Sequence, residues 1–222
     1  MVGVAENFSK EQMERFVRVG PNNAGYTHLQ TLNMARAITR LDAIYIPASA
    51  QTEGYAEGVL NTLPNLPSDV VVERLRARMD REEALRSGGV QQTVVIGRRA
   101  LTGAHIDEQQ LIHLKTLVEA NRPEMDIRIM AGEGDVLPTP KNWPLRDTAS
   151  SLMIVHSFDE QRIRYTDGNL LTAHLDDGGT IVEGLLAARL EGAAQFMAAT
   201  ALRGSAALEA IDVAIQQLPA SS

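Results

Sequence analysis

The stretch QQTVVIGRRALTGAHIDEQQLIHLKTLVEANRPEMDIRIM, residues 91–130, predicts a strand, a helix and a second strand. Segment 93–96 is a strand by composition, and segment 127–130 alternates with the period of two that is typical of a half-buried strand. Between them, Asp107 and Gln110 form a helix-start signal, and a leucine-rich amphipathic face follows until an Arg-Pro pair ends it. The rest of the chain is interpreted outward from this strand–helix–strand unit.

On the C-terminal side the sequence predicts more strands and then helices. Segments 152–158 and 161–166 have the form of a β-hairpin, and segment 170–175 adds one more strand. The Ala-rich segments 182–200 and 205–218 are predicted helices, and their small residues favour self-association of the chain.

On the N-terminal side the pattern is mainly helical. Ser9 and Gln12 form a capping box that starts a short helix, and a second helical stretch is predicted over residues 27–39. An extended apolar segment, 43–47, comes next, and residues 69–87 form a long helix by their apolar spacing.

This order of elements predicts an α+β fold. We expect a small mixed or antiparallel sheet of about four to five strands, covered by helices from both ends of the chain. Residues 1–25 are expected to form an N-terminal helical extension, and residues 26–222 a single domain.

Composition narrows the class of protein. The 222 residues carry a net charge of −7, 4% aromatic residues and no cysteine, which excludes disulfides and thiolate-bound metals. No apolar run is long enough to span a membrane and no signal peptide is evident, so a cytoplasmic protein without membrane contact is expected. The acidic balance argues against a general nucleic-acid binder.

The candidate proton-transfer residues lie in the predicted strands. His156 sits in an apolar strand, with Tyr165 on the partner strand of the predicted hairpin, and burial could bring the pKa of His156 near neutrality for acid–base work. His174 and Asp176 point the same way in an extended segment and form an oriented pair. The competing interpretations are a core-edge histidine bonded to a carbonyl and a plain polar turn. No metal site is predicted, because the histidines lack chelating spacing.

The arginines suggest two different roles. Along helix 69–87 they alternate with acidic residues at helical spacing, which pairs Glu82 with Arg78 and Arg86 and predicts a solvated face of ion pairs. Arg98 follows an apolar strand and is the better candidate for recognising a carboxylate or a phosphate.

A ligand pocket is predicted where these segments meet. Gln51 and Tyr55 are four residues apart and present an amide and a phenol on one helical face. Together with Arg98 and the predicted hairpin they would line the pocket, and the long loop with Trp143 would close it. The alternative is that Gln51 and Tyr55 are only a helix start packed on the core.

Several short motifs follow one another in the order of a known family. They begin with Gln51-Thr52-Glu53-Gly54-Tyr55-Ala56 and continue with Arg74–Leu85, Arg99-Ala100-Leu101, segment 110–130 and segment 152–158. Over roughly residues 26–200 the chain resembles the C-terminal Scr1-type (DUF5753-like) domain of actinobacterial helix-turn-helix regulators. The resemblance implies a domain that senses a ligand or binds a partner.

The chain departs from the family pattern in three ways. Ala48-Ser49-Ala50 replaces a Gly-Leu-Leu run, and Arg81-Glu82 replaces an Arg-Gln pair. Only about 25 residues precede the matching region, too few for a helix-turn-helix domain, so DNA binding is not expected.

Two functions from different classes remain open. The first is a stand-alone domain, derived from a regulator's sensory domain, that binds a small-molecule ligand or a small partner protein. The second is an enzyme of specialised-metabolite (natural-product) biosynthesis that uses acid–base residues or a bound cofactor such as haem in the same pocket. No sequence signal selects a cofactor, and fold alone does not choose between the two functions.

Overall fold

The fold is built on one mixed sheet. The computed structural model describes residues 6–19, 29–30, 32–63, 66–132, 151–157, 163–167, 180–182 and 184–219. In these residues six strands lie in the order β3-β2-β1-β4-β5-β6. Their bounds are β1 Ala35–Asp42, β2 Gln91–Ile96, β3 Met125–Ile129, β4 Ser151–Ser157, β5 Ile163–Asp167 and β6 Thr180–Val182. Strands β1 to β3 are parallel, and β4, β5 and β6 continue the sheet in antiparallel pairs.

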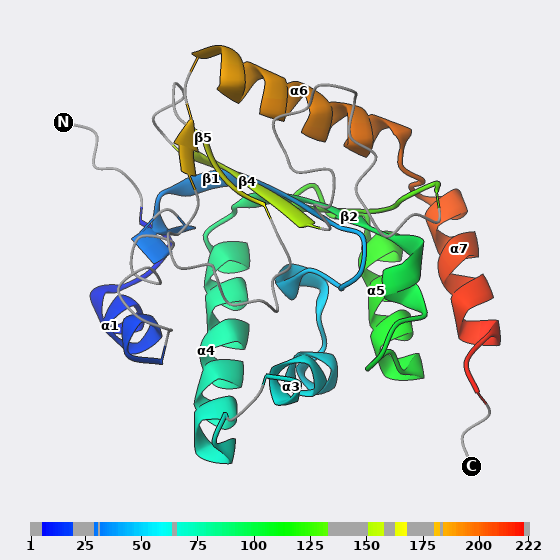
Figure 1. Ribbon diagram of the computed structural model, residues 1–222, viewed down its shortest axis with the longest axis horizontal. Coiled ribbons are helices and arrows are strands. Elements are labelled where there is room, and N and C mark those ends of the chain that lie inside the picture. Colours follow the sequence, from blue (N-terminus) through cyan, green and yellow to red (C-terminus); the bar gives the residue numbers. More distant parts are fainter. Residues whose placement is uncertain are drawn as a thin grey trace.

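Helices cover the two faces unequally. Figure 1 shows α1, α3, α4 and α5 on one face of the sheet, α6 along the opposite face, and α7 beside α5. The helices are α1 Lys10–Val19, α3 Glu53–Asn61, α4 Ser68–Ser87, α5 Glu108–Ala120, α6 Gly184–Thr200 and α7 Ser205–Gln216, with short 3₁₀ turns η1 Ala48–Ala50 and η2 Arg98–Leu101. The described helices have neither the length nor the apolar character needed to cross a membrane.

The α+β class and the mixed sheet are confirmed, and the described residues contribute six strands to it. The predicted hairpin strands pair as expected, with Ile154 opposite Tyr165 and His156 opposite Ile163. The capping box at the start of α1 is also present, since the Ser9 amide donates to Gln12 Oε1 (2.8 Å) and the Gln12 amide donates to Ser9 Oγ (3.2 Å).

The predicted helix over residues 27–39 is wrong in its second half, where β1 begins at Ala35. The strand lies at the centre of the sheet, parallel to β2 on one side and antiparallel to β4 on the other. Ladder hydrogen bonds and packing on both sides outweigh the local helix preference of its alanines and arginines.

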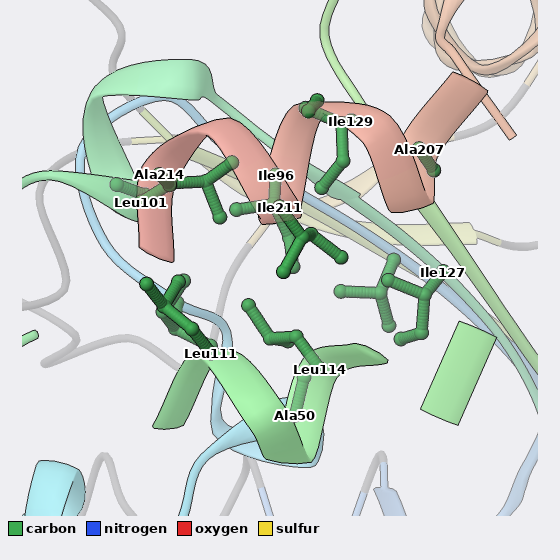
Figure 2. Close-up of a cluster of buried hydrophobic side chains, with 14 of the residues drawn as sticks. Ala50, Ile96, Leu101, Leu111, Leu114, Ile127, Ile129, Ala207, Ile211 and Ala214 are labelled. Carbon is green, nitrogen blue, oxygen red and sulfur yellow. The ribbon is translucent and has the colours of Figure 1, made fainter. Parts of the chain in front are cut away.

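Two apolar clusters fill the face covered by several helices. Figure 2 shows the larger one, in which Ile96, Ile127 and Ile129 of the sheet meet leucines of α5 and small residues of α7. The second joins α1 to α4 and the sheet: the Phe8 and Phe16 rings meet edge to face, with centroids 5.4 Å apart.

Segment 6–19 is held to the sheet by hydrogen bonds as well as by its aromatic rings. Asn7 Nδ2 donates to the carbonyls of Leu32 and Ala35 at 2.9 and 2.8 Å. The Phe8 amide donates to Asn33 Oδ1 at 2.6 Å. An ion pair of 2.6 Å between Arg15 and Asp80 then fixes α1 on α4.

Candidate functional site

The candidate site lies at the carboxyl edge of the parallel strands, where β1 and β2 end side by side. The Gly97 amide donates to the Asp42 carbonyl at 2.7 Å, and a Cβ at Gly97 would lie only 2.2 Å from the Ala43 oxygen. Glycine is therefore required where the two strand ends touch. In open sheets with parallel strands this edge is the usual place for a ligand.

Asp42, the last residue of β1, is a buried carboxyl group with one unpaired oxygen. Its side chain is only 1% exposed, and Oδ1 accepts hydrogen bonds from the amides of Ile44 (2.9 Å) and Tyr45 (2.8 Å). Oδ2 has no hydrogen-bond partner among the described residues. Burial raises the pKa of Asp42 to about 7, although the two backbone amides oppose the change.

The chain after Asp42 is held by Gln51 and Tyr55. Gln51 Nε2 donates to the Ile46 carbonyl (2.6 Å), and the Ile46 amide donates to Tyr55 Oη (3.1 Å). Burial raises the pKa of Tyr55 to about 12, so the phenol stays neutral. Both predicted ligand-binding residues are thus buried and bonded to the backbone of the same loop residue.

Gln110 of α5 fixes the other end of this loop. Its Oε1 accepts from the Thr52 amide (2.7 Å) and its Nε2 donates to the Ala50 carbonyl (2.8 Å). Thr52 in turn caps α3 by accepting from the Tyr55 amide at 3.2 Å. The position of Gln51 therefore depends on a glutamine about sixty residues further along the chain.

Replacing Gln110 with methionine is expected to lower the free energy of unfolding by about 2 kcal/mol, because the Thr52 amide and the Ala50 carbonyl lose their partner. Urea unfolding measures this loss. Gln109→Met, at the exposed neighbouring position, is the control and should change stability by less than about 0.5 kcal/mol. Equal effects of the two variants would contradict the role assigned to the Gln110 amide.

The arginine-rich helix does not present the solvated ion-pair face that its sequence predicts. Glu82 is only 3% exposed and accepts from Arg40 of β1 through both oxygens, at 2.7 and 3.2 Å. Arg81 Nε lies 3.6 Å from the same carboxylate, while Arg86 pairs with Glu83 instead. The prediction fails because the arginine of β1 provides a buried partner that the helical spacing cannot reveal.

The charges around Glu82 determine its ionisation. Burial alone would raise the pKa of this carboxyl group, but Arg40, Arg81 and Arg78 outweigh burial and lower it. The buried carboxylate is therefore ionised and holds the surrounding guanidinium groups together.

Three arginines of α4 lie along one side of the helix, and we call Arg74, Arg78 and Arg81 the arginine row. Arg78 donates through Nη1 to Gln51 Oε1 at 3.1 Å, and it makes no ion pair within 4 Å among the described residues. Burial, together with the charge of Arg81, lowers the pKa of Arg78 to about 10. The Nε of Arg74 is buried and has no hydrogen-bond partner in the described part of the chain.

Arg98 lies in η2, directly after β2, at the same edge of the sheet as Asp42. Its Nε is also buried without a hydrogen-bond partner in the residues that the structure describes. Its location after a strand is the one that the sequence predicts for an anion-recognising residue, and the recognition itself stays a prediction.

The structure does not place His156 beside Gln51 and Tyr55. Its neighbour in β4, Val155, packs with Phe8 on the α1–α4 side, so His156 projects from the opposite face, which α6 covers. Burial lowers the pKa of His156, with Arg36 acting in the same direction and Glu191 of α6 opposing it. The single pocket predicted from the sequence is thus divided between two faces of the sheet.

The remaining predicted residues fall partly outside the described structure. Trp143, His174 and Asp176 lie outside the described residues, and Tyr165 is placed only by its register in β5. Across the described ranges, no group of three or more His, Asp or Glu side chains could hold a metal ion.

The sequence interpretation overlooked Arg40 and Asp42, and it placed Glu82 on a solvated helix face. A signal for the first two exists, since Arg40 and Asp42 are the charged residues within the mainly apolar run from Ile38 to Ile46. Charged residues within such a run require partners when the segment is buried. No comparable local signal marks Glu82.

Fold and site together define an α+β domain that gathers buried charged groups at the carboxyl edge of its parallel strands. The family model described as Domain of unknown function (DUF5753) matches residues 27–212, and the chain belongs to this family. Comparisons with curated proteins and with solved structures found no match.

Proposed function

We propose that this protein is a binding domain whose site is the carboxyl edge of strands β1 and β2, and that it takes a small molecule or a segment of a small partner protein. The proposal includes no contact with DNA, because a net charge of −7 does not favour the neutralisation of phosphates on which DNA affinity depends.

One observation carries the proposal. Three of the buried polar atoms without partners in the described residues belong to the end of β1 and the turns η1 and η2 that follow the two strands: Asp42 Oδ2, Ser49 Oγ and Arg98 Nε. Native structures pair nearly all of their buried polar groups, so unpaired groups gathered in one region require an explanation. A polar ligand bound at the edge supplies the missing partners.

A thermal-unfolding screen tests the proposal with a panel of acids, amines and neutral polar metabolites. A ligand present at about one hundred times its Kd stabilises the fold by about 2.7 kcal/mol. For a chain of this size that corresponds to a rise in Tm of roughly 5–10 °C.

Substitutions at and away from this edge test whether the stabilising compound binds there. Asp42→Asn and Arg98→Gln should weaken binding of the stabilising compound, while Glu57→Gln, at an exposed position of α3, should leave it unchanged. A panel without any stabilising compound, or equal binding by all variants, would overturn the proposal.

A second candidate function rests on Asp42. A carboxyl group with a pKa of about 7 is poised to exchange a proton at neutral pH, which suits a general acid or base. Under this enzymatic alternative, Asp42→Asn abolishes turnover of a bound compound while its affinity changes little. Turnover that persists in the variant would count against it.

A further inference from the structure

The arginine row has the geometry of a linear anion-binding surface. Arg74, Arg78 and Arg81 occupy positions i, i+4 and i+7 of α4, so they follow one side of the helix over roughly 10 Å. The Gln51 amide oxygen orients the middle guanidinium through the hydrogen bond from Arg78 Nη1. A fixed guanidinium loses less conformational freedom when it binds an anion.

The charges of this cluster do not balance. Arg40, Arg78 and Arg81 surround a single carboxylate, that of Glu82, and Arg74 lies one helical turn before Arg78. Arg40 binds both oxygens of that carboxylate and Arg81 lies 3.6 Å from one of them, so within the described residues Arg74 and Arg78 have no carboxylate within 4 Å. Two further acids of the helix are engaged elsewhere, since Asp80 pairs with Arg15 and Glu83 with Arg86.

The row is also within reach of solvent. The Arg81 side chain is 22% exposed, and Arg74 and Arg78 are partly exposed. Guanidinium groups in such a half-buried position interact with an anion more strongly than fully exposed ones, because less water screens the charge. Their planar donors also match the paired oxygens of carboxylate and phosphate groups.

We propose that the arginine row binds a small molecule with at least two anionic groups, carboxylates or phosphates, set along the axis of α4. This inference rests on the proposed function, because it names the chemical class of the ligand taken by that binding domain. A single negative charge would leave most of the cluster unbalanced, whereas two or three would neutralise it.

Isothermal titration calorimetry with citrate and with pyrophosphate tests the inference, with acetate at equal ionic strength as the singly charged probe. We expect one citrate or one pyrophosphate per chain and at least tenfold weaker binding of acetate. A preference for one of the two multivalent probes distinguishes a carboxylate ligand from a phosphate ligand.

Variants of one helix separate specific binding from general attraction by positive charge. Arg74→Gln and Arg78→Gln should each weaken binding of the preferred anion about tenfold or more. Arg76→Gln removes the same charge from an exposed position of α4 and should change the affinity less than twofold. Urea unfolding without anion checks that each variant is folded before its affinity is compared.

The outcomes distinguish this inference from the proposed function. Absence of binding by citrate and pyrophosphate, or an equal loss in Arg76→Gln, overturns the anion site. In that case, binding of an amine or neutral compound that depends on Asp42 and Arg98 still supports the proposed function. If the whole panel fails as well, both proposals fail.

Discussion

Replacing Glu82 with glutamine is expected to lower the free energy of unfolding by about 3–5 kcal/mol, the range observed when one partner of a buried ion pair is removed. The carboxylate is 3% exposed and holds Arg40 through two hydrogen bonds, with Arg81 close by. Its loss leaves several guanidinium groups close together without an opposing charge. Urea unfolding at neutral pH measures the effect.

Glu83→Gln is the matched control, since Glu83 is the next residue of the same helix, 61% exposed and paired with Arg86. That variant should change stability by less than about 0.5 kcal/mol.

The pH dependence of stability gives a second test of the role of Glu82. Because the pKa of Glu82 is lowered in the folded state from 4.5, its stabilising effect is complete above pH 4.5 and is lost as the pH falls through the lowered value. A difference between wild type and Glu82→Gln that persists in strong acid would contradict this account.

Asp42→Asn is expected to remove a large pH dependence of stability. The folded-state pKa of about 7 lies above the ordinary value of 3.8, so the folded protein binds the proton more tightly than the unfolded chain. Stability contributed by the protonated group is therefore complete below pH 3.8 and declines as the pH rises to about 7. Between pH 5 and pH 8 the wild type should lose about 3 kcal/mol through this residue, and the variant none.

Urea unfolding of both proteins at pH 5 and pH 8 measures this difference. The two proteins differ only at residue 42, so the comparison isolates the contribution of this residue. Glu57→Gln, an exposed acid whose change removes the same charge, should retain the pH dependence of the wild type. Parallel pH profiles of wild type and Asp42→Asn would contradict the raised pKa of Asp42.

The elements with strong local signals could be predicted from the sequence. Asp107 caps α5 by accepting from the Gln110 amide at 2.7 Å, and the alternating pattern of 127–130 falls almost entirely within β3. Strand β1 could not be predicted in this way, because its conformation is set by pairing with β2 and β4, which lie far away in the sequence. Tertiary pairing overrode the local preference there.

The site was predictable only in part. Gln51 and Tyr55 were expected on one helical face, but α3 begins at Glu53, so Gln51 precedes the helix. Nothing local indicated that both side chains would be bonded to the backbone of Ile46. The Arg40–Glu82 pair joins residues 42 positions apart, and the helical spacing of Glu82 suggested nearer partners. Buried charge networks depend on contacts between segments that are distant in the sequence. The spacing of residues within one segment carries no information about such contacts.

The docking of segment 6–19 means that the boundary of the family and the boundary of the folding unit do not coincide. The family match begins at residue 27, yet Phe8 and Phe16 are among the most deeply buried rings of the protein. A polypeptide trimmed to the matched region would leave Ile38, Leu85 and Val155 on an open apolar patch, the kind of surface that promotes association. In this chain the matched region therefore depends for its solubility on residues that precede it.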